Sequence, residues 1–184
     1  MNSYPLFDRA ALTAAFTMLG ERLAQRSIVA DVYIVGGAAM MLAYDSRRAT
    51  RDVDALFTPH GVVLEEAAFV AGRLGLPRSW INEQASVYIS TKSDQEARPV
   101  FEHPGLRVSA ASPRHLLAMK ILSARRYADL ADTVELLRIL RITTVDDVER
   151  ICADVFPQEP LTDKSRLFAE DALGAVTGTP RDAG

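Results

Sequence analysis

The sequence has one cysteine, few aromatic residues and no long apolar run among its 184 residues. The single cysteine, Cys152, cannot pair within the chain, so a fold held by disulfides is excluded. No segment approaches the roughly 20 apolar residues of a membrane-spanning helix, and no basic start followed by an apolar core marks a signal peptide. These absences predict a protein without a membrane anchor that lies in the cytoplasm.

Positive charge is also not in excess, because the formal net charge is −3. This balance excludes a protein coated uniformly in basic residues for nucleic-acid binding. An RNA substrate would have to be bound by local arginine clusters. Two such clusters are present, namely Arg47, Arg48 and Arg51, and Arg114, Arg125 and Arg126.

The remaining composition is that of a globular protein with a buried core. Hydrophobic residues make up 48% and charged residues 24% of the chain, and both values are ordinary for a soluble domain. Cys152 falls on the apolar side of a helical pattern, which predicts a buried thiol. The three histidines show no metal-ligand spacing with one another or with Cys152, so no zinc site is expected.

Hydrophobic periodicity divides the chain into an α/β (α+β) part and a helical part. Apolar residues at helical spacing predict helices over residues 7–25, 38–44 and 61–74, and then four successive helices over 113–126, 128–141, 144–155 and 161–176. Short apolar runs predict strands over 31–35, 53–57, 87–89, 99–101 and 106–108, hence a mixed sheet of about five strands. Ser112 and Pro113 form an N-cap and first-turn pair that opens the helical part.

The most informative stretch is an apolar strand that runs into Gly36 and Gly37, followed by a helix and a second strand with Asp52 and Asp54. Residues i and i+2 of a strand share a face, so the two carboxylates converge while Val53 points into the core. Paired carboxylates suggest magnesium, which proteins hold with one or two carboxylates plus substrate phosphates. Glycines let phosphates approach the backbone closely. The pattern is typical of nucleotidyl transfer.

Further motifs follow in a fixed order along the chain. The glycines precede Arg48-x-Thr50-x-Asp52-x-Asp54, and a helix around Lys120 precedes Asp129-x-x-Asp132. In this order and spacing the chain resembles the AbiEii/MenT-like nucleotidyltransferases over roughly residues 31–140. These are bacterial proteins of the DNA polymerase beta-like nucleotidyltransferase superfamily, and many are toxins of toxin–antitoxin pairs.

The resemblance implies transfer of a nucleoside monophosphate from an NTP, with magnesium, to the 3′ end of tRNA or to another RNA acceptor. Such a transfer blocks translation, and a cognate antitoxin is an implied partner. The implied fold is polymerase beta-like, with a small mixed sheet flanked by helices and a C-terminal helical bundle. Residues 1–111 are expected to form the nucleotidyltransferase core, 112–177 to complete the active-site cleft, and 178–184 to be a disordered tail.

Carried over residue by residue, the resemblance implies five catalytic residues. Asp52 and Asp54 are implied as the metal ligands, and Lys120 as the basic residue that contacts the phosphates of the nucleotide. Asp129 and Asp132 match the paired acids of the last motif, where one of them orients the lysine or an arginine. From spacing alone, these two acids equally fit a solvated helix surface with salt bridges.

The same lysine belongs to the expected nucleotide-binding residues, together with five others. Gly36 and Gly37 are implied as the triphosphate cradle, and Arg48 and Arg125 as further contacts. Thr50 alternates with the two strand acids, so its hydroxyl can face a phosphate or a metal-bound water. A capping or packing role fits Thr50 equally well.

The chain departs from the family pattern at one position, and the third carboxylate that polymerase beta-like enzymes commonly have cannot be assigned to a residue. Gly37 stands where family members often carry serine. Polymerase beta-like enzymes commonly add a third carboxylate on a neighbouring strand, but Asp94 lies in a polar run typical of a loop, and Glu102 is only a candidate strand residue. Two rival functions therefore stay open. The site either modifies a small molecule or a protein side chain, or it binds nucleotide without catalysis.

Overall fold

The computed structural model describes residues 6–46 and 49–178. The chain forms two compact units. The N-terminal unit comprises Met1–Val87 and Glu96–Ala111, and the helical unit comprises Tyr88–Gln95 and Ser112–Gly184. Residues 88–95, which precede the last strands of the sheet, thus belong to the helical unit.

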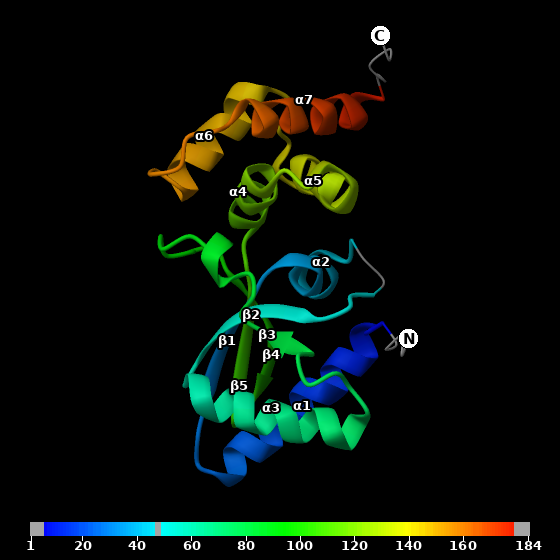
Figure 1. Ribbon diagram of the computed structural model, residues 1–184, viewed down its shortest axis with the longest axis vertical. Coiled ribbons are helices and arrows are strands. Elements are labelled where there is room, and N and C mark those ends of the chain that lie inside the picture. The colour runs from blue at the N-terminus through cyan, green and yellow to red at the C-terminus, as the bar shows by residue number, and fades with distance from the viewer. Residues whose placement is uncertain (1–5, 47–48, 179–184) are drawn as a thin grey trace. The chain divides into compact units, whose positions relative to one another are not determined.

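The N-terminal unit is a five-stranded mixed sheet with helices, shown in Figure 1. Its elements are α1 (Arg9–Gln25), β1 (Ala30–Ile34), α2 (Gly36–Tyr44), β2 (Val53–Thr58), α3 (His60–Leu74), β3 (Ile81–Asn82), β4 (Arg98–His103) and β5 (Leu106–Ala110). The strand order is β3-β2-β1-β5-β4. Strand β1 pairs antiparallel with β2 and parallel with β5, β2 pairs parallel with β3, and β4 pairs antiparallel with β5. The expected α+β fold class is confirmed.

Two parts of the expected sheet are wrong. The strand predicted over 87–89 does not form, because Ser86–Tyr88 is instead a short 3₁₀ helix, η1. The side chains of Val87 and Tyr88 are largely exposed, so the apolar run that suggested a strand covers no core. The fifth strand is β3, which is too short to show a period of two in the sequence.

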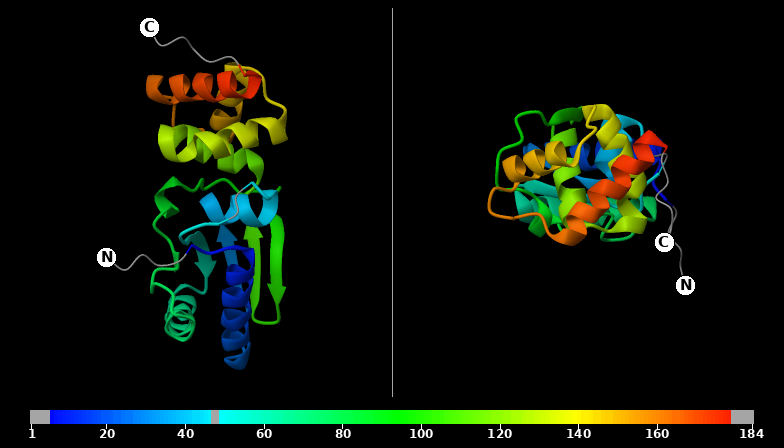
Figure 2. Two further views of the ribbon diagram at one scale, coloured as in Figure 1. Left: turned by 90° about the vertical axis from the view of Figure 1, so that its right-hand side faces the viewer. Right: turned by 90° about the horizontal axis from the view of Figure 1, so that it is seen from above.

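The core of the N-terminal unit lies between the sheet and helices α1 and α3. Helix α1 runs alongside the strands in Figure 2, whereas α3 lies across the strand direction in Figure 1. Trp80 is fully buried and donates its indole N–H to the Ala67 carbonyl of α3 at 3.0 Å. Phe16 of α1 packs against Trp80 and against Phe101 of β4, with ring centroids 6.0 and 5.6 Å apart. Trp80 is therefore a core anchor.

One buried ionic cluster joins α1 to α3. Glu66 is 3% exposed and contacts Arg22 and Arg26, each at 2.7 Å. We refer to these three residues as the Glu66 cluster. Burial by itself raises the pKa of Glu66, but the hydrogen bonds from Arg26 and Arg22 outweigh it, and the net shift is downward. The two arginines therefore supply hydrogen bonds to the buried Glu66 carboxylate and favour its ionised form.

The helical unit contains α4 (Pro113–Ser123), α5 (Arg126–Leu140), α6 (Val145–Val155) and α7 (Asp163–Thr177). The four predicted helices are confirmed to within a few residues at each end. Ser112 is the N-cap of α4, with Pro113 in its first turn, as predicted. Thr144 caps α6 by accepting from the Asp147 amide at 3.2 Å. Of the tail 178–184, for which disorder was expected, Gly178 is instead the C-cap of α7, and residues 179–184 lie outside the described residues.

The segment 88–95 is bound to the helical unit by polar contacts. The Ser90 hydroxyl donates to the Val155 carbonyl at 2.5 Å, and Lys92 Nζ lies 2.5 Å from the Asp154 carboxylate. Asp94 accepts from the amide of Ser112 at 2.7 Å. These contacts explain why eight residues that precede β4 in the sequence group with the later helices.

Cys152 is fully buried in α6, as predicted. Burial, aided by the charge of Glu149, raises the pKa of its thiol to about 12. The thiol is therefore protonated at neutral pH and is not a nucleophile. In the part of the chain that the structure describes, no helix has the length and apolar character needed to span a membrane.

Candidate functional site

The turn from β1 into α2 brings a glycine against a carboxylate. Gly36, the first residue of α2, has a φ of +60°, which lies in the left-handed region that favours glycine. A methyl group added at Gly36 would lie 3.4 Å from Asp54 Oδ2, so the backbone and the carboxylate are already close. The Val35 amide donates to the Asp54 carbonyl at 2.9 Å and fixes this turn to β2. Gly37, the other predicted cradle residue, is half-buried in the same turn.

The paired acids flank a buried residue at the start of β2. Val53 is fully buried, whereas Asp52 and Asp54 are only partly buried. This alternation is the one that the sequence predicts, because successive strand residues point to opposite faces. Asp52 immediately precedes β2 and Asp54 is its second residue, and neither acid shares the full burial of Val53.

The Thr50 side chain is buried and hydrogen-bonded within the segment that precedes β2. It is 7% exposed, and its hydroxyl donates to the Asp52 carbonyl at 3.0 Å. Its backbone also pairs with Phe7 in an isolated antiparallel bridge, with hydrogen bonds of 2.7 and 2.8 Å. Of the two roles left open by the sequence, these contacts favour packing, since they hold the segment that carries Asp52.

The donor set determines which kind of metal binding the N-terminal unit can offer. Among the described residues, no group of three or more histidine, cysteine, aspartate or glutamate side chains could hold a metal ion. A closed site made of protein ligands alone is therefore not present in this part of the chain. Magnesium, however, ordinarily takes one or two carboxylates from a protein and further oxygens from substrate phosphates. Asp52 and Asp54 fit an ion that binds together with a nucleotide.

The neighbour of the paired acids on β3 is an amide, a residue that sequence reasoning missed. Asn82 lies opposite Asp54 in the parallel register of β3 and β2, and paired residues of adjacent strands share a face. Asn82 is 7% exposed; its Oδ1 accepts from the Gln84 amide at 2.9 Å, and its Nδ2 donates to the Ser79 carbonyl at 3.4 Å. The only hint in the sequence is that Asn82 follows the buried Trp80-Ile81 pair.

Neither acid considered as a third carboxylate joins the pair within the N-terminal unit. Asp94 belongs to the helical unit, where it accepts from the Ser112 amide and lies 3.3 Å from Nδ1 of His115. It therefore helps to hold the first turn of α4. Glu102 is an exposed residue of β4, in register with Arg107.

The helical unit contains a buried cation held by two buried acids. Lys120 of α4 is 7% exposed, and its Nζ lies 2.9 Å from Asp129 Oδ1 and 2.8 Å from Asp132 Oδ2. Both aspartates are 2% exposed. Arg125 Nε contacts the other oxygen of Asp129 at 3.0 Å, although the Arg125 side chain is 70% exposed. We refer to these four residues as the Lys120 cluster.

A left-handed residue between the two helices makes the Lys120 cluster possible. Ala124 has a φ of +45° and ends α4, and α5 begins two residues later. The reversal places Asp129 and Asp132, which share a face of α5, against Lys120. The solvated-surface interpretation of the two acids is therefore wrong, because both are buried. The prediction that one of them orients the lysine or an arginine matches the contacts that Asp129 makes with both cations.

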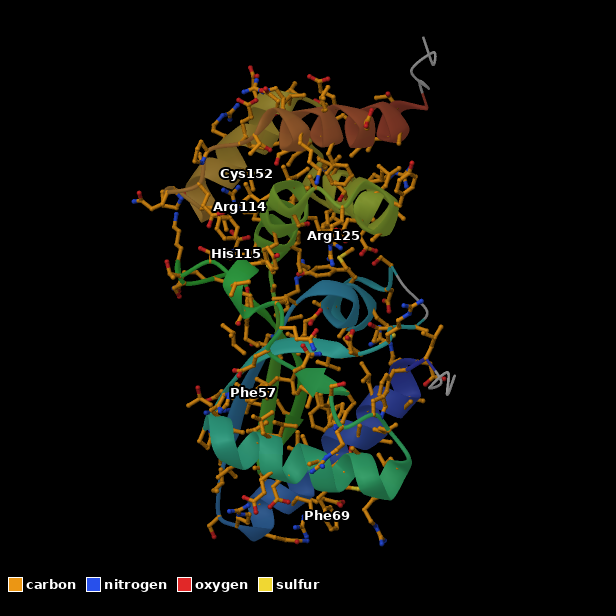
Figure 3. The ribbon with its side chains drawn as sticks, in the orientation of Figure 1. Phe57, Phe69, Arg114, His115, Arg125 and Cys152 are labelled. Carbon is orange, nitrogen blue, oxygen red and sulfur yellow. The ribbon has the colours of Figure 1, made fainter. Side chains whose placement is uncertain are left out.

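The remaining arginines that the sequence singled out are exposed, form a surface ion pair or lie outside the described part of the chain. Arg48 was predicted to bind nucleotide, and both it and Arg47 lie outside the described residues, as does the side chain of Arg126. Arg51 is exposed. Arg114 pairs with Asp154 at 3.1 Å; Figure 3 labels it together with His115 and Arg125, which belong to the same helical unit.

Comparison with known proteins identifies the family but not a characterised relative. Residues 10–162 match the family described as "Nucleotidyltransferase of unknown function (DUF6036)". No curated protein and no solved structure matches the chain significantly. The match spans both the paired acids of β2 and the Lys120 cluster, and it covers most of the 184 residues. The chain therefore belongs to this family of nucleotidyltransferases.

Proposed function

We propose that this protein transfers a nucleoside monophosphate from an NTP to an RNA acceptor, the 3′ end of tRNA, and that it thereby acts as a bacterial toxin that blocks translation. The observation that carries the chemical part is the closeness of Asp54 to the glycine turn at the start of α2, where a methyl group added at Gly36 would lie 3.4 Å from Asp54 Oδ2. The acceptor and the toxin role rest on the resemblance to AbiEii/MenT-like proteins.

In this proposal, the N-terminal unit binds the phosphates. The backbone at Gly36 and Gly37 contacts the triphosphate, because no side chain keeps the phosphates away and the amides at the start of α2 favour an anion. Asp52 and Asp54 would hold magnesium, which supplies neutralisation of the phosphate charge and activation of the acceptor hydroxyl. Thr50 keeps the Asp52 segment in place through its bond to the Asp52 carbonyl.

Lys120 is the proposed phosphate contact of the helical unit. An ammonium group has three N–H donors, and two of them point to Asp129 and Asp132. In this proposal the two acids fix the position of Nζ, and the remaining donor contacts a phosphate of the nucleotide. In-line attack by the acceptor hydroxyl on the α-phosphorus then releases pyrophosphate.

The direct test is transfer of radiolabel from each of four α-labelled NTPs, with magnesium, to total RNA and total protein. We expect a labelled band of tRNA size with the wild-type chain and none with Asp52→Ala/Asp54→Ala. Asp31→Asn is a matched control, because Asp31 is an exposed acid on β1 that pairs with Arg107 at 2.7 Å. Equal labelling of RNA by the wild type and the double variant would overturn the assignment of the site.

The toxin role has a separate test in living bacteria. Expression of the chain should arrest growth, and Asp52→Ala or Lys120→Ala should relieve the arrest. Immunoblots at matched expression would exclude loss of the variant proteins as the cause of relief. Unchanged growth arrest in both variants would contradict the toxin mechanism proposed here.

A second candidate function is a nucleotide-binding module without catalysis. The observation that favours it is Asn82, a neutral amide in register with Asp54 on the neighbouring strand β3, whereas polymerase beta-like enzymes commonly add a third carboxylate on a neighbouring strand. This function predicts nucleotide binding without release of pyrophosphate. Labelling of a protein or a small molecule instead of RNA would favour the third alternative, transfer to an acceptor of that class.

A further inference from the structure

Among the residues that the structure describes, Tyr127 is an aromatic residue that lies outside the packing. Tyr127, in the first turn of α5, is 102% exposed, so its ring is open to water on both faces. The other exposed tyrosine that we use for comparison, Tyr88 of η1, is 57% exposed. A fully exposed ring contributes nothing to the core, and its faces are available for stacking.

An exposed cation held in a fixed position lies two residues away. The Arg125 side chain is 70% exposed, while its Nε is bound to the buried carboxylate of Asp129 at 3.0 Å. The acids of the Lys120 cluster are buried and the Arg125 side chain is exposed, so a ligand in solvent meets the guanidinium rather than the carboxylates. The guanidinium nitrogens beyond Nε remain as donors for an anion.

The combination of an exposed ring and an anchored arginine is typical of surfaces that bind single-stranded nucleic acid. There, bases stack on aromatic side chains, and basic residues contact the backbone phosphates. A free nucleotide is less well matched, because small-molecule sites are concave and bury most of their ligand, whereas the Tyr127 ring is fully open.

We propose that Tyr127 stacks on an unpaired base of the RNA acceptor while Arg125 contacts the adjacent phosphate. This inference rests on the proposed function for the identity of the ligand, and it adds the residues that bind the acceptor strand. It concerns binding alone, so it is separable from the chemistry assigned to Asp52 and Asp54.

The test is binding of the purified full-length chain to a fluorescein-labelled single-stranded RNA dodecamer of mixed sequence, and to bulk deacylated bacterial tRNA, measured by fluorescence anisotropy. Tyr127→Ala should weaken binding about fivefold or more, in the range measured for loss of one base stack. Tyr127→Phe keeps the ring and should bind within about twofold of the wild type. Tyr88→Ala is the matched control and should leave RNA affinity unchanged.

Two further measurements separate this role from a structural one. Because Tyr127 is fully exposed, Tyr127→Ala should leave the thermal unfolding midpoint and the affinity for a fluorescent NTP analogue unchanged. Arg125→Gln should reduce the slope of log affinity against log salt concentration by about 0.7, the value for one phosphate contact on a single strand.

The outcomes are distinct for the two proposals. RNA affinity that is the same for Tyr127→Ala and the wild type, or no RNA binding by the wild type, overturns the inference. RNA binding that depends on Tyr127 but is accompanied by no label transfer supports the inference and contradicts the proposed reaction. Label transfer to RNA that is lost in Asp52→Ala/Asp54→Ala, together with an RNA affinity that Tyr127→Ala leaves unchanged, supports the reaction and overturns the role of Tyr127.

Discussion

The two units each contain a buried ionic cluster, but the clusters have opposite arrangements. In the Glu66 cluster one acid is held by two cations, and in the Lys120 cluster one lysine is held by two acids. The cations around Glu66 are about one-third exposed, so they keep contact with water. Lys120, Asp129 and Asp132 are all at least nine-tenths buried. The second cluster therefore removes three charged groups from water at once.

The difference indicates which cluster has a function beyond stability. Replacing buried ion pairs with apolar residues of similar volume is often neutral or stabilising, because desolvation offsets much of the attraction. A fully buried triad is thus an expensive way to pack α4 against α5, and a cationic group kept ready for phosphates gives a reason for it. The Glu66 cluster joins α1 to α3 and contains none of the predicted site residues, so we interpret it as structural.

The largest effect is expected when Lys120 alone is removed. Lys120→Met leaves Asp129 and Asp132 buried without their common partner, which should cost about 3–5 kcal/mol of unfolding free energy and abolish nucleotidyl transfer. Urea denaturation and the label-transfer assay measure the two effects. The matched control is Lys120→Met/Asp129→Asn/Asp132→Asn, which removes all three charges and should regain most of the stability while staying inactive. A fully active triple variant would show that the cluster is only structural.

A smaller effect is expected for the acid of the other cluster. Glu66→Gln removes charged hydrogen bonds with Arg22 and Arg26 and should cost about 1–3 kcal/mol at pH 7, with transfer activity unchanged. The pKa of Glu66 is lowered in the folded state, so its stabilisation is complete above the unfolded pKa, about 4.3, and is lost as pH falls through the folded pKa. The stability gap between the wild type and Glu66→Gln should therefore close on acidification. A gap that widens below pH 4 would contradict this assignment.

The smallest effect is expected for an exposed acid that, like Glu66, is held by two cations. Asp154 also contacts two cations, Lys92 and Arg114, whose hydrogen bonds lower its pKa, but its side chain is half exposed. Asp154→Asn should shift the thermal midpoint less than Glu66→Gln does, and the shift should vanish in 1 M salt, where screening acts over about 3 Å. An equal shift of the thermal midpoint in Asp154→Asn and Glu66→Gln would show that burial does not make the contacts of Glu66 more stabilising than those of Asp154.

Local patterns predicted the elements of the candidate site well. The alternation at Asp52, Val53 and Asp54 indicated one buried and two outward-facing residues, because the side-chain period of a strand is two. Ser112 followed by Pro113 indicated the start of α4, since both residues act within the first turn. In these cases, the physical cause lies within a few neighbouring residues, so the sequence contains it in full.

Patterns that depend on distant partners were predicted incompletely. The strand expected over 87–89 had the right residue types but no sheet neighbour, whereas the two residues of β3 form a strand only by pairing with β2. Asn82 was missed for the same reason, since its position beside Asp54 exists only in that pairing. Asp94 was correctly interpreted as a loop residue, but its contact with the start of α4 connects positions 18 residues apart.

By itself, the sequence determined the α+β class, the order of the helical part and the residue types that point to nucleotidyl transfer. These follow from periodicity, capping and motif spacing, which act over short stretches of chain. Only the tertiary structure decided that Lys120 is buried between Asp129 and Asp132, that Thr50 supports the Asp52 segment, and that Tyr127 is left fully exposed. The physical reason is that burial and ion pairing depend on which surfaces the folded chain brings together.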